Sequence, residues 1–152
     1  MKRVIVFFLG VAIIFIPIAV VSSQERTGNG TKTGTLVVLI DGFENDRGDA
    51  RAGLCNSPEE YKSERETFRQ TVLPVRSGKV EWVLKDLPWG EYAVKVHHDK
   101  NANGILDKNA VGIVKEAYGF SNNARGFFGP PDYEAAAFKF DQAAMTIRIT
   151  VK

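Results

Sequence analysis

The sequence predicts an all-β fold, namely a single antiparallel β-sandwich of the transthyretin or immunoglobulin type with one long ordered loop excursion. Three observations lead to this prediction. Several segments alternate apolar and polar residues with a period of two, the pattern of strands with one buried face. Short stretches rich in glycine, proline and aspartate separate these segments. No long amphipathic helix pattern is present, so the strands must pack against one another in two layers.

The N-terminal segment is typical of a secretory signal peptide. Lys2 and Arg3 precede an uncharged run, residues 4–21, and the small residues of "SSQE" follow it. We expect residues 1–23 to be removed by a cut after Ser23, which makes the product secreted or periplasmic, with no stable membrane insertion. The alternative is an uncleaved anchor, because the run approaches the ~20 apolar residues that span a bilayer. Pro17 and the small residues favour cleavage.

Composition excludes one class of partner and limits what holds the fold together. The chain has 20 Lys plus Arg and 18 Asp plus Glu, and removal of Lys2 and Arg3 leaves 18 of each sign. A neutral chain without a basic cluster does not predict a nucleic-acid-binding surface. Cys55 is the only cysteine and cannot form an internal disulfide, so we expect it to be buried at a strand end.

The first half of the mature chain contains two expected strands and one ambiguous segment. Residues 24–34, "QERTGNGTKTG", predict a flexible linker, and the domain then occupies residues 35–152. "TLVVLID", residues 35–41, ends in an Asp-Gly turn signal and is the first strand. "DARAGLCNS" is a second strand, and Ser57 before Pro58 indicates a capped helical turn. "RQTVLPVRSG" is ambiguous, since Pro74 marks an edge strand or a bulge.

The second half contains the clearest alternation. In "KVEWVLKDLP", residues 79–88, Val80, Trp82 and Leu84 share one face. The Pro-Trp-Gly turn connects this segment to "GEYAVKVHHD", residues 90–99, whose apolar positions also alternate. "AMTIRITV", residues 144–151, repeats the pattern near the end of the chain. Each segment therefore predicts a strand with one buried face.

The segment "HHDKNANGILD", residues 97–107, begins where a predicted strand ends. Its D-x-N-x-N-G spacing is that of the first half of a calcium-binding loop, in which alternate side chains converge and glycine allows the bend. On that template the candidate metal ligands are Asp99, Asn101, Asn103, the carbonyl of Ile105, Asp107 and, from outside the loop, Glu116. The twelfth position is Ala110 instead of glutamate. The alternative is a series of Asx turns without an ion, so calcium is the one candidate cofactor and both interpretations stay open.

Residues for catalysis are few. His97 and His98 point to opposite faces of a strand and cannot chelate together, and we expect His98 to hydrogen-bond into the loop and fix Asp99. Ser121 lacks the strand-turn-helix setting of a serine nucleophile. A small metal-dependent enzyme using His98, Asp99 and Glu116 is the alternative, while the sequence favours a noncatalytic protein.

Residues 111–140 form a long segment that combines glycines and prolines with many aromatic residues. Such a composition predicts an ordered excursion packed over one end of the sandwich, because aromatic residues bury well and favour order. Long ordered loops on a rigid scaffold commonly carry binding sites. The candidate ligand-binding residues are Tyr118, Phe120, Asn122, Phe127 and Phe128.

Residues 87–140 also resemble a known family. "GEYAV", "HHDKNANGILD", "EAYGFSNNA" and "FGPPDYEAAAF" are similar to the signature of the DUF2141 family of bacterial secreted or periplasmic domains. Val114 stands where that signature has proline, and Ala117 where it has glycine. The turn "DLPWGEY" is similar to turns of transthyretin-like and collagen-adhesin B-type sandwich modules. The resemblance implies the fold but no reaction, so we predict a binding or structural module whose partner is a carbohydrate or an envelope protein.

Overall fold

The computed structural model describes residues 30–152. The strands are β1 (Thr33–Asp41), β2 (Asp49–Cys55), β3 (Arg69–Pro74), β4 (Lys79–Pro88), β5 (Gly90–Asp99), β6 (Tyr118–Phe120), β7 (Phe138–Phe140) and β8 (Ala144–Thr150). Three short helical elements accompany them: α1 (Pro58–Lys62), the 3-10 turn η1 (Ser121–Asn123) and α2 (Tyr133–Ala136). The predicted signal peptide and most of the predicted linker lie outside the described residues.

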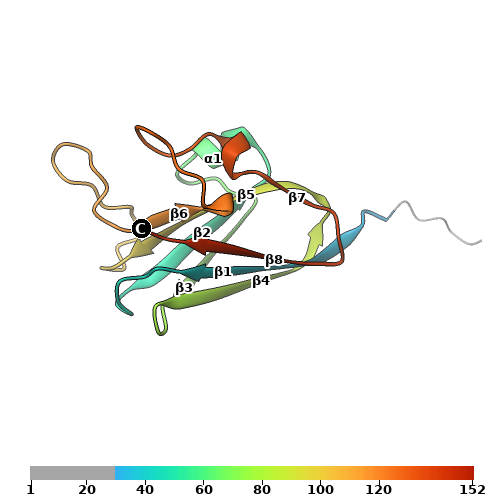
Figure 1. Cartoon of the computed structure of the whole chain (residues 1–152), viewed down its shortest axis with the longest axis horizontal. Coiled ribbons are helices and arrows are strands. Elements are labelled where there is room, and N and C mark those ends of the chain that lie inside the picture. Colours follow the sequence, from blue (N-terminus) through green and yellow to red (C-terminus); the bar gives the residue numbers. More distant parts are fainter. Residues whose placement is uncertain (1–29) are drawn as a thin grey trace, which may run out of the picture.

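The strands form two facing sheets (Figure 1). One has the order β4-β1-β8, and the other has the order β3-β2-β5-β6, with β7 paired to the beginning of β5. The core between the sheets is made by the alternating side chains that the sequence indicates, among them Leu36, Val38, Val80, Leu84, Val94 and Ile149. The all-β sandwich is therefore confirmed.

One strand pair departs from the predicted antiparallel arrangement. β8 runs parallel to β1, with Leu36 opposite Met145 and Ile40 opposite Ile149. The chain reaches β8 directly from β7 of the other sheet, so it crosses between layers and enters beside β1 in the same direction. Alternation in "AMTIRITV" predicts a half-buried strand but carries no information about its direction.

Most element boundaries agree with expectation. Ser57 caps α1, since its Oγ accepts a hydrogen bond from the Glu60 amide at 3.3 Å. β3 lies at a sheet edge and ends at Pro74, which settles the ambiguous segment as an edge strand. β1 begins at Thr33, two residues earlier than predicted, so the last two residues of the predicted linker belong to the strand.

A second apolar cluster packs on the outer side of β5. It contains Cys55, Tyr61, Ala93, Phe120, Tyr133 and Ala136. Ser121, which is fully buried, joins three segments there: its Oγ accepts from the Val94 amide at 2.8 Å and donates to the Ala136 carbonyl at 2.5 Å. Cys55 is free, fully buried and at the end of β2, as predicted. Part of the aromatic excursion is thus packed against the sandwich.

β5 places the candidate site. It pairs with β2 from Ala93 to Asp99 and with β6 near its end, where His97 lies opposite both Arg51 and Tyr118. β5 ends at Asp99, and the β5–β6 loop, residues 100–117, leaves the sandwich at that point (Figure 1). No helix within residues 30–152 is long and apolar enough to cross a membrane.

Candidate functional site

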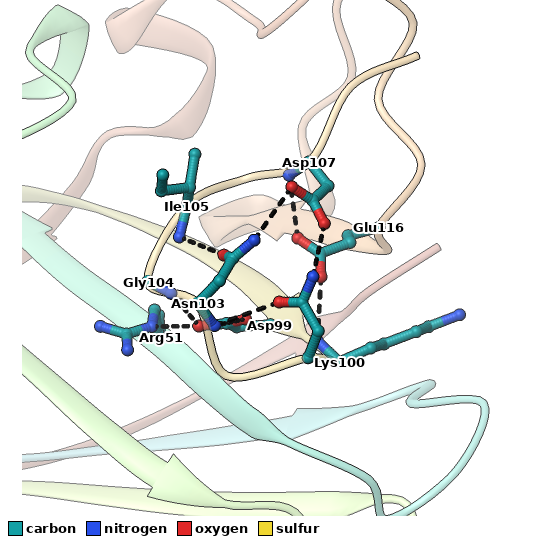
Figure 2. Close-up of polar contacts among 9 residues, drawn as sticks. Arg51, Asp99, Lys100, Asn103, Gly104, Ile105, Asp107 and Glu116 are labelled. Carbon is teal, nitrogen blue, oxygen red and sulfur yellow. Dashed lines mark hydrogen bonds and ion pairs between the residues drawn. The ribbon is translucent and has the colours of Figure 1, made fainter.

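Asp99 is the centre of the polar network at the end of β5. Its carboxylate is fully buried and accepts three hydrogen bonds: from Arg51 Nε at 2.6 Å, from the Asn103 amide at 3.0 Å and from the Gly104 amide at 2.8 Å (Figure 2). Burial raises the pKa of the Asp99 carboxyl, but the Arg51 bond and the two backbone bonds outweigh it and hold the pKa below its usual value. Asp99 is therefore a structural anion with its own cationic partner.

The two asparagines form successive Asx turns. Asn101 Oδ1 accepts from the Asn103 amide at 3.1 Å, and Asn103 Oδ1 accepts from the Ile105 amide at 2.8 Å. Their side-chain amides donate to the two carboxylate oxygens of Asp107, at 2.8 Å from Asn101 and 3.1 Å from Asn103. Gly104 has φ +84°, a conformation that glycine adopts without strain. The asparagine side chains thus close the bend with bonds to the loop itself.

Glu116 joins the two ends of this bend. It is 5% exposed, and its carboxylate accepts from the Lys100 amide at 2.9 Å and from the Asp107 amide at 3.0 Å. Figure 2 shows the Glu116 carboxylate between these two parts of the loop, while the Lys100 side chain extends away from it. Lys100 and Asp107 lie at the two ends of the bend, and Glu116 holds the loop closed by accepting from both.

The histidines lie on opposite faces of β5, as alternation requires. His98 is fully buried and packs edge-on against Phe43, with ring centroids 5.1 Å apart. Its Nε2 lies 2.7 Å from the Arg47 carbonyl oxygen, which belongs to the β1–β2 connection. The predicted hydrogen bond from His98 into the loop at Asp99 is therefore wrong, because His98 shares the core-facing parity of Tyr92 and Val94.

His97, on the other face, lies near the charged groups of the loop. Burial lowers the pKa of its imidazole, although the nearby carboxylates of Glu116 and Asp99 act in the opposite direction. His98, Asp99 and Glu116 do not converge on a common point, since His98 faces the core between the sheets. Among the described residues, no group of three or more His, Cys, Asp or Glu side chains is arranged to hold a metal ion.

The five candidate ligand-binding residues are not brought together. Phe120 is 8% exposed and packs against Tyr61 at 5.8 Å, while Tyr118 is half-buried beside it. Asn122 has φ 59° and donates to the Ala137 carbonyl at 2.8 Å, so it fastens η1 to α2. These three residues support the fold around the excursion.

Phe127 and Phe128 differ from all the other aromatic residues of the excursion. They are 93% and 97% exposed and contact each other in a T-shaped pair with centroids 4.7 Å apart. The expectation that the excursion packs over the sandwich does not hold for this pair. They form the tip of the phenylalanine loop, residues 124–131, which projects from the sandwich in Figure 1.

Arg51 is the site residue that the sequence did not single out. It alternates with apolar Ala50 and Ala52 in β2, which predicts only an outward-facing side chain. Its pairing with Asp99 depends on the register of β2 against β5, where Arg51 faces His97 and Asp49 faces Asp99. That register is a tertiary property, and a single sequence does not contain it.

Fold and site together define a small β-sandwich domain with a hydrogen-bonded polar loop at the end of its central strand. The comparison with protein families is consistent with this class and goes further. Residues 38–148 match the family described as "Uncharacterized protein conserved in bacteria (DUF2141)", and the chain belongs to that family. No curated protein and no solved structure matches the chain.

Proposed function

We propose that this protein is a noncatalytic binding module of the secreted or periplasmic compartment, in which loops at one end of a rigid sandwich contact the partner. The observation that carries the proposal is the exposed pair Phe127 and Phe128, at 93% and 97% exposure. Exposed clusters of large apolar side chains on soluble domains mark interaction sites, because water contact with so much apolar surface is unfavourable.

The polar loop supports a noncatalytic role. His98 and Asp99 are fully buried and Glu116 is 5% exposed, and each has a hydrogen-bond partner within the protein. We assign this loop an architectural role: it holds the β5–β6 loop in one conformation. Calcium coordinated by the same oxygens is the alternative, but Arg51 already supplies a positive charge 2.6 Å from Asp99, so we expect no ion to bind there.

The proposal is tested with fractions of a bacterial envelope, separated into glycans, proteins and lipids and immobilised in turn. We expect one fraction to retain the protein, and the variant F127S/F128S to bind it at least about tenfold more weakly. The matched control is V72S/V83S, which removes two apolar side chains that are 47% and 43% exposed on strands β3 and β4. If no fraction distinguishes the phenylalanine variant from the control, the protein is not a binding module of this kind.

A further inference from the structure

Exposed apolar surface is concentrated in two loops. The five most exposed large apolar side chains of the described residues are Ile105, Val111, Ile113, Phe127 and Phe128, at 65%, 78%, 63%, 93% and 97%. The first three belong to the β5–β6 loop and the last two to the phenylalanine loop. The other exposed large apolar side chains, Phe68, Val72 and Val83, reach only 37% to 47%.

The two loops are anchored at the same place. The β5–β6 loop is followed by Tyr118, the first residue of β6, and the phenylalanine loop begins beside that residue. Arg125 donates from its two terminal nitrogens to the Tyr118 carbonyl at 3.3 Å and to the Thr150 carbonyl at 3.1 Å. In Figure 1 both loops project toward the end of the sandwich that lies opposite the start of β1.

The tip of the β5–β6 loop satisfies its backbone internally. The amides of Val111 and Ile113 both donate to Asn109 Oδ1, at 3.0 and 2.9 Å, and the Gly112 amide donates to the Asn109 carbonyl at 2.9 Å. The Asn109 amide in turn donates to the Ile113 carbonyl at 2.8 Å. Transfer of unpaired backbone amides from water to an apolar medium is unfavourable. Because the amides of this tip already have partners, the free energy of moving the tip into such a medium is lower.

The phenylalanine loop is restricted by two prolines and lacks polar side chains at its tip. Residues 126–131, "GFFGPP", contain none, and Pro130 and Pro131 have no amide donor. The loop closes tightly, because a Cβ added at Gly126 would lie 2.2 Å from the Gly129 carbonyl oxygen. The two rings are therefore presented on a narrow, preformed protrusion.

Charges near the β5–β6 loop favour an anionic partner surface. Its carboxylates, on Asp107 and Glu116, accept hydrogen bonds from within the loop. Of its lysines, Lys108 is exposed but lies 3.8 Å from the Glu64 carboxylate, whereas Lys115 is exposed and lines a shallow depression of about 380 Å³ together with Lys100 and Lys152. The depression also contains Glu44, which pairs with the Lys100 amine at 2.5 Å. Lys115 is thus available to an external anion.

On these grounds we propose that the two loops dock the protein on the surface of a lipid bilayer. The apolar tips enter the boundary between headgroups and acyl chains, and Lys115 contacts lipid phosphate groups. A bilayer fits two separate protruding tips because it deforms around each, whereas a protein partner would need a matching cavity for each one. This inference rests on the proposed function, names the partner, and requires no membrane-spanning segment.

The test measures binding of the full chain, purified from the extracytoplasmic fraction of a bacterial host, to vesicles of phosphatidylcholine with and without phosphatidylglycerol. We expect F127S/F128S and V111S/I113S each to weaken binding at least about tenfold, and V72S/V83S to leave it unchanged. K115Q should weaken binding to the anionic vesicles alone. Glycerol phosphate in solution should not compete, because an isolated headgroup offers no apolar interior to the tips.

If residues 1–23 are retained, they could bind vesicles themselves, so the mass of the intact protein is measured first. A fluorescent reporter in the phenylalanine loop then shows whether that loop contacts the bilayer. In the variant F128W, vesicles with brominated acyl chains should quench the added tryptophan emission and shift it to shorter wavelength, after subtraction of the wild-type spectrum. Emission that stays typical of water in the presence of bound vesicles overturns the inference. Loop-dependent retention by a glycan or protein fraction without vesicle binding would reject the lipid partner and leave the binding module standing. Absence of loop-dependent binding to any fraction would reject both.

Discussion

Replacement of Asp99 by asparagine measures how much the polar loop contributes to the fold. The wild-type carboxylate accepts three hydrogen bonds, one of them from Arg51. Asparagine keeps one acceptor oxygen and turns an NH₂ group toward the remaining donors, so at least one charge-assisted bond is lost, at about 1.5–3 kcal/mol. Breaking a fully buried ion pair costs about 3–5 kcal/mol. The Arg51 side chain is 32% exposed and regains part of its hydration when the pair is broken. We therefore expect D99N to lower the free energy of unfolding by about 2–3 kcal/mol.

For a domain of this size such a loss lowers the melting temperature by roughly 10 °C. The assay is thermal unfolding followed by circular dichroism, with D141N as the matched control, since Asp141 forms an exposed pair with Lys139 at 2.9 Å and should matter little. The pKa of Asp99 is lower in the folded chain than its ordinary 3.8, so its stabilisation is present above pH 3.8 and is lost as the pH falls through the folded pKa. Equal melting temperatures for D99N and D141N, or a difference as large at pH 3 as at pH 7, would refute the assignment.

Three further predictions follow from the same geometry. The melting temperature should be the same within error in about 5 mM calcium and in chelator, because the loop oxygens already have partners; a rise of several degrees would show a bound ion. Burial raises the pKa of the Cys55 thiol to about 11, so a thiol reagent at pH 8 should react only as the protein unfolds, and rapid reaction of the native protein would contradict this. S121A should destabilise the fold by about 1–3 kcal/mol in urea titrations, since it leaves the buried Val94 amide without its acceptor; a change below about 0.5 kcal/mol would show that another group replaces the hydroxyl.

Alternation was enough to predict the long strands but not the short ones. β4 buries alternate residues along most of its length and β5 does so from Val94 to His98, so each carries its own signal in sequence. β6 and β7 have three residues each, fewer than alternation can define, and both exist because β5 offers them an edge. Their positions follow from the tertiary structure rather than from local preference.

The candidate site divides in the same way. The Asx turns of Asn101 and Asn103 are bonds to residues two positions along the chain, so their spacing is visible in sequence. The bonds of Arg51 to Asp99 and of Glu116 to Lys100 span 48 and 16 residues, and they require the fold to be known. The D-x-N-x-N-G pattern alone therefore fits either a calcium site or a series of Asx turns. The long-range bonds of Arg51 and Glu116 favour the turns, because they give the loop protein partners in place of an ion.

Rigidity and exposure in the two loops have a common physical basis. A flexible loop carrying two phenylalanines would fold back and cover them, since burial of each ring against the sandwich is favourable. Here Arg125 fixes the base of the phenylalanine loop, the close approach at Gly126 narrows it, and Pro130 and Pro131 restrict its return. Asn109 restrains the tip of the neighbouring loop in a similar manner. The same bonds that restrain these loops thus keep their apolar side chains from folding back onto the sandwich, and the exposed tips are the feature on which the proposed contact with an external partner rests.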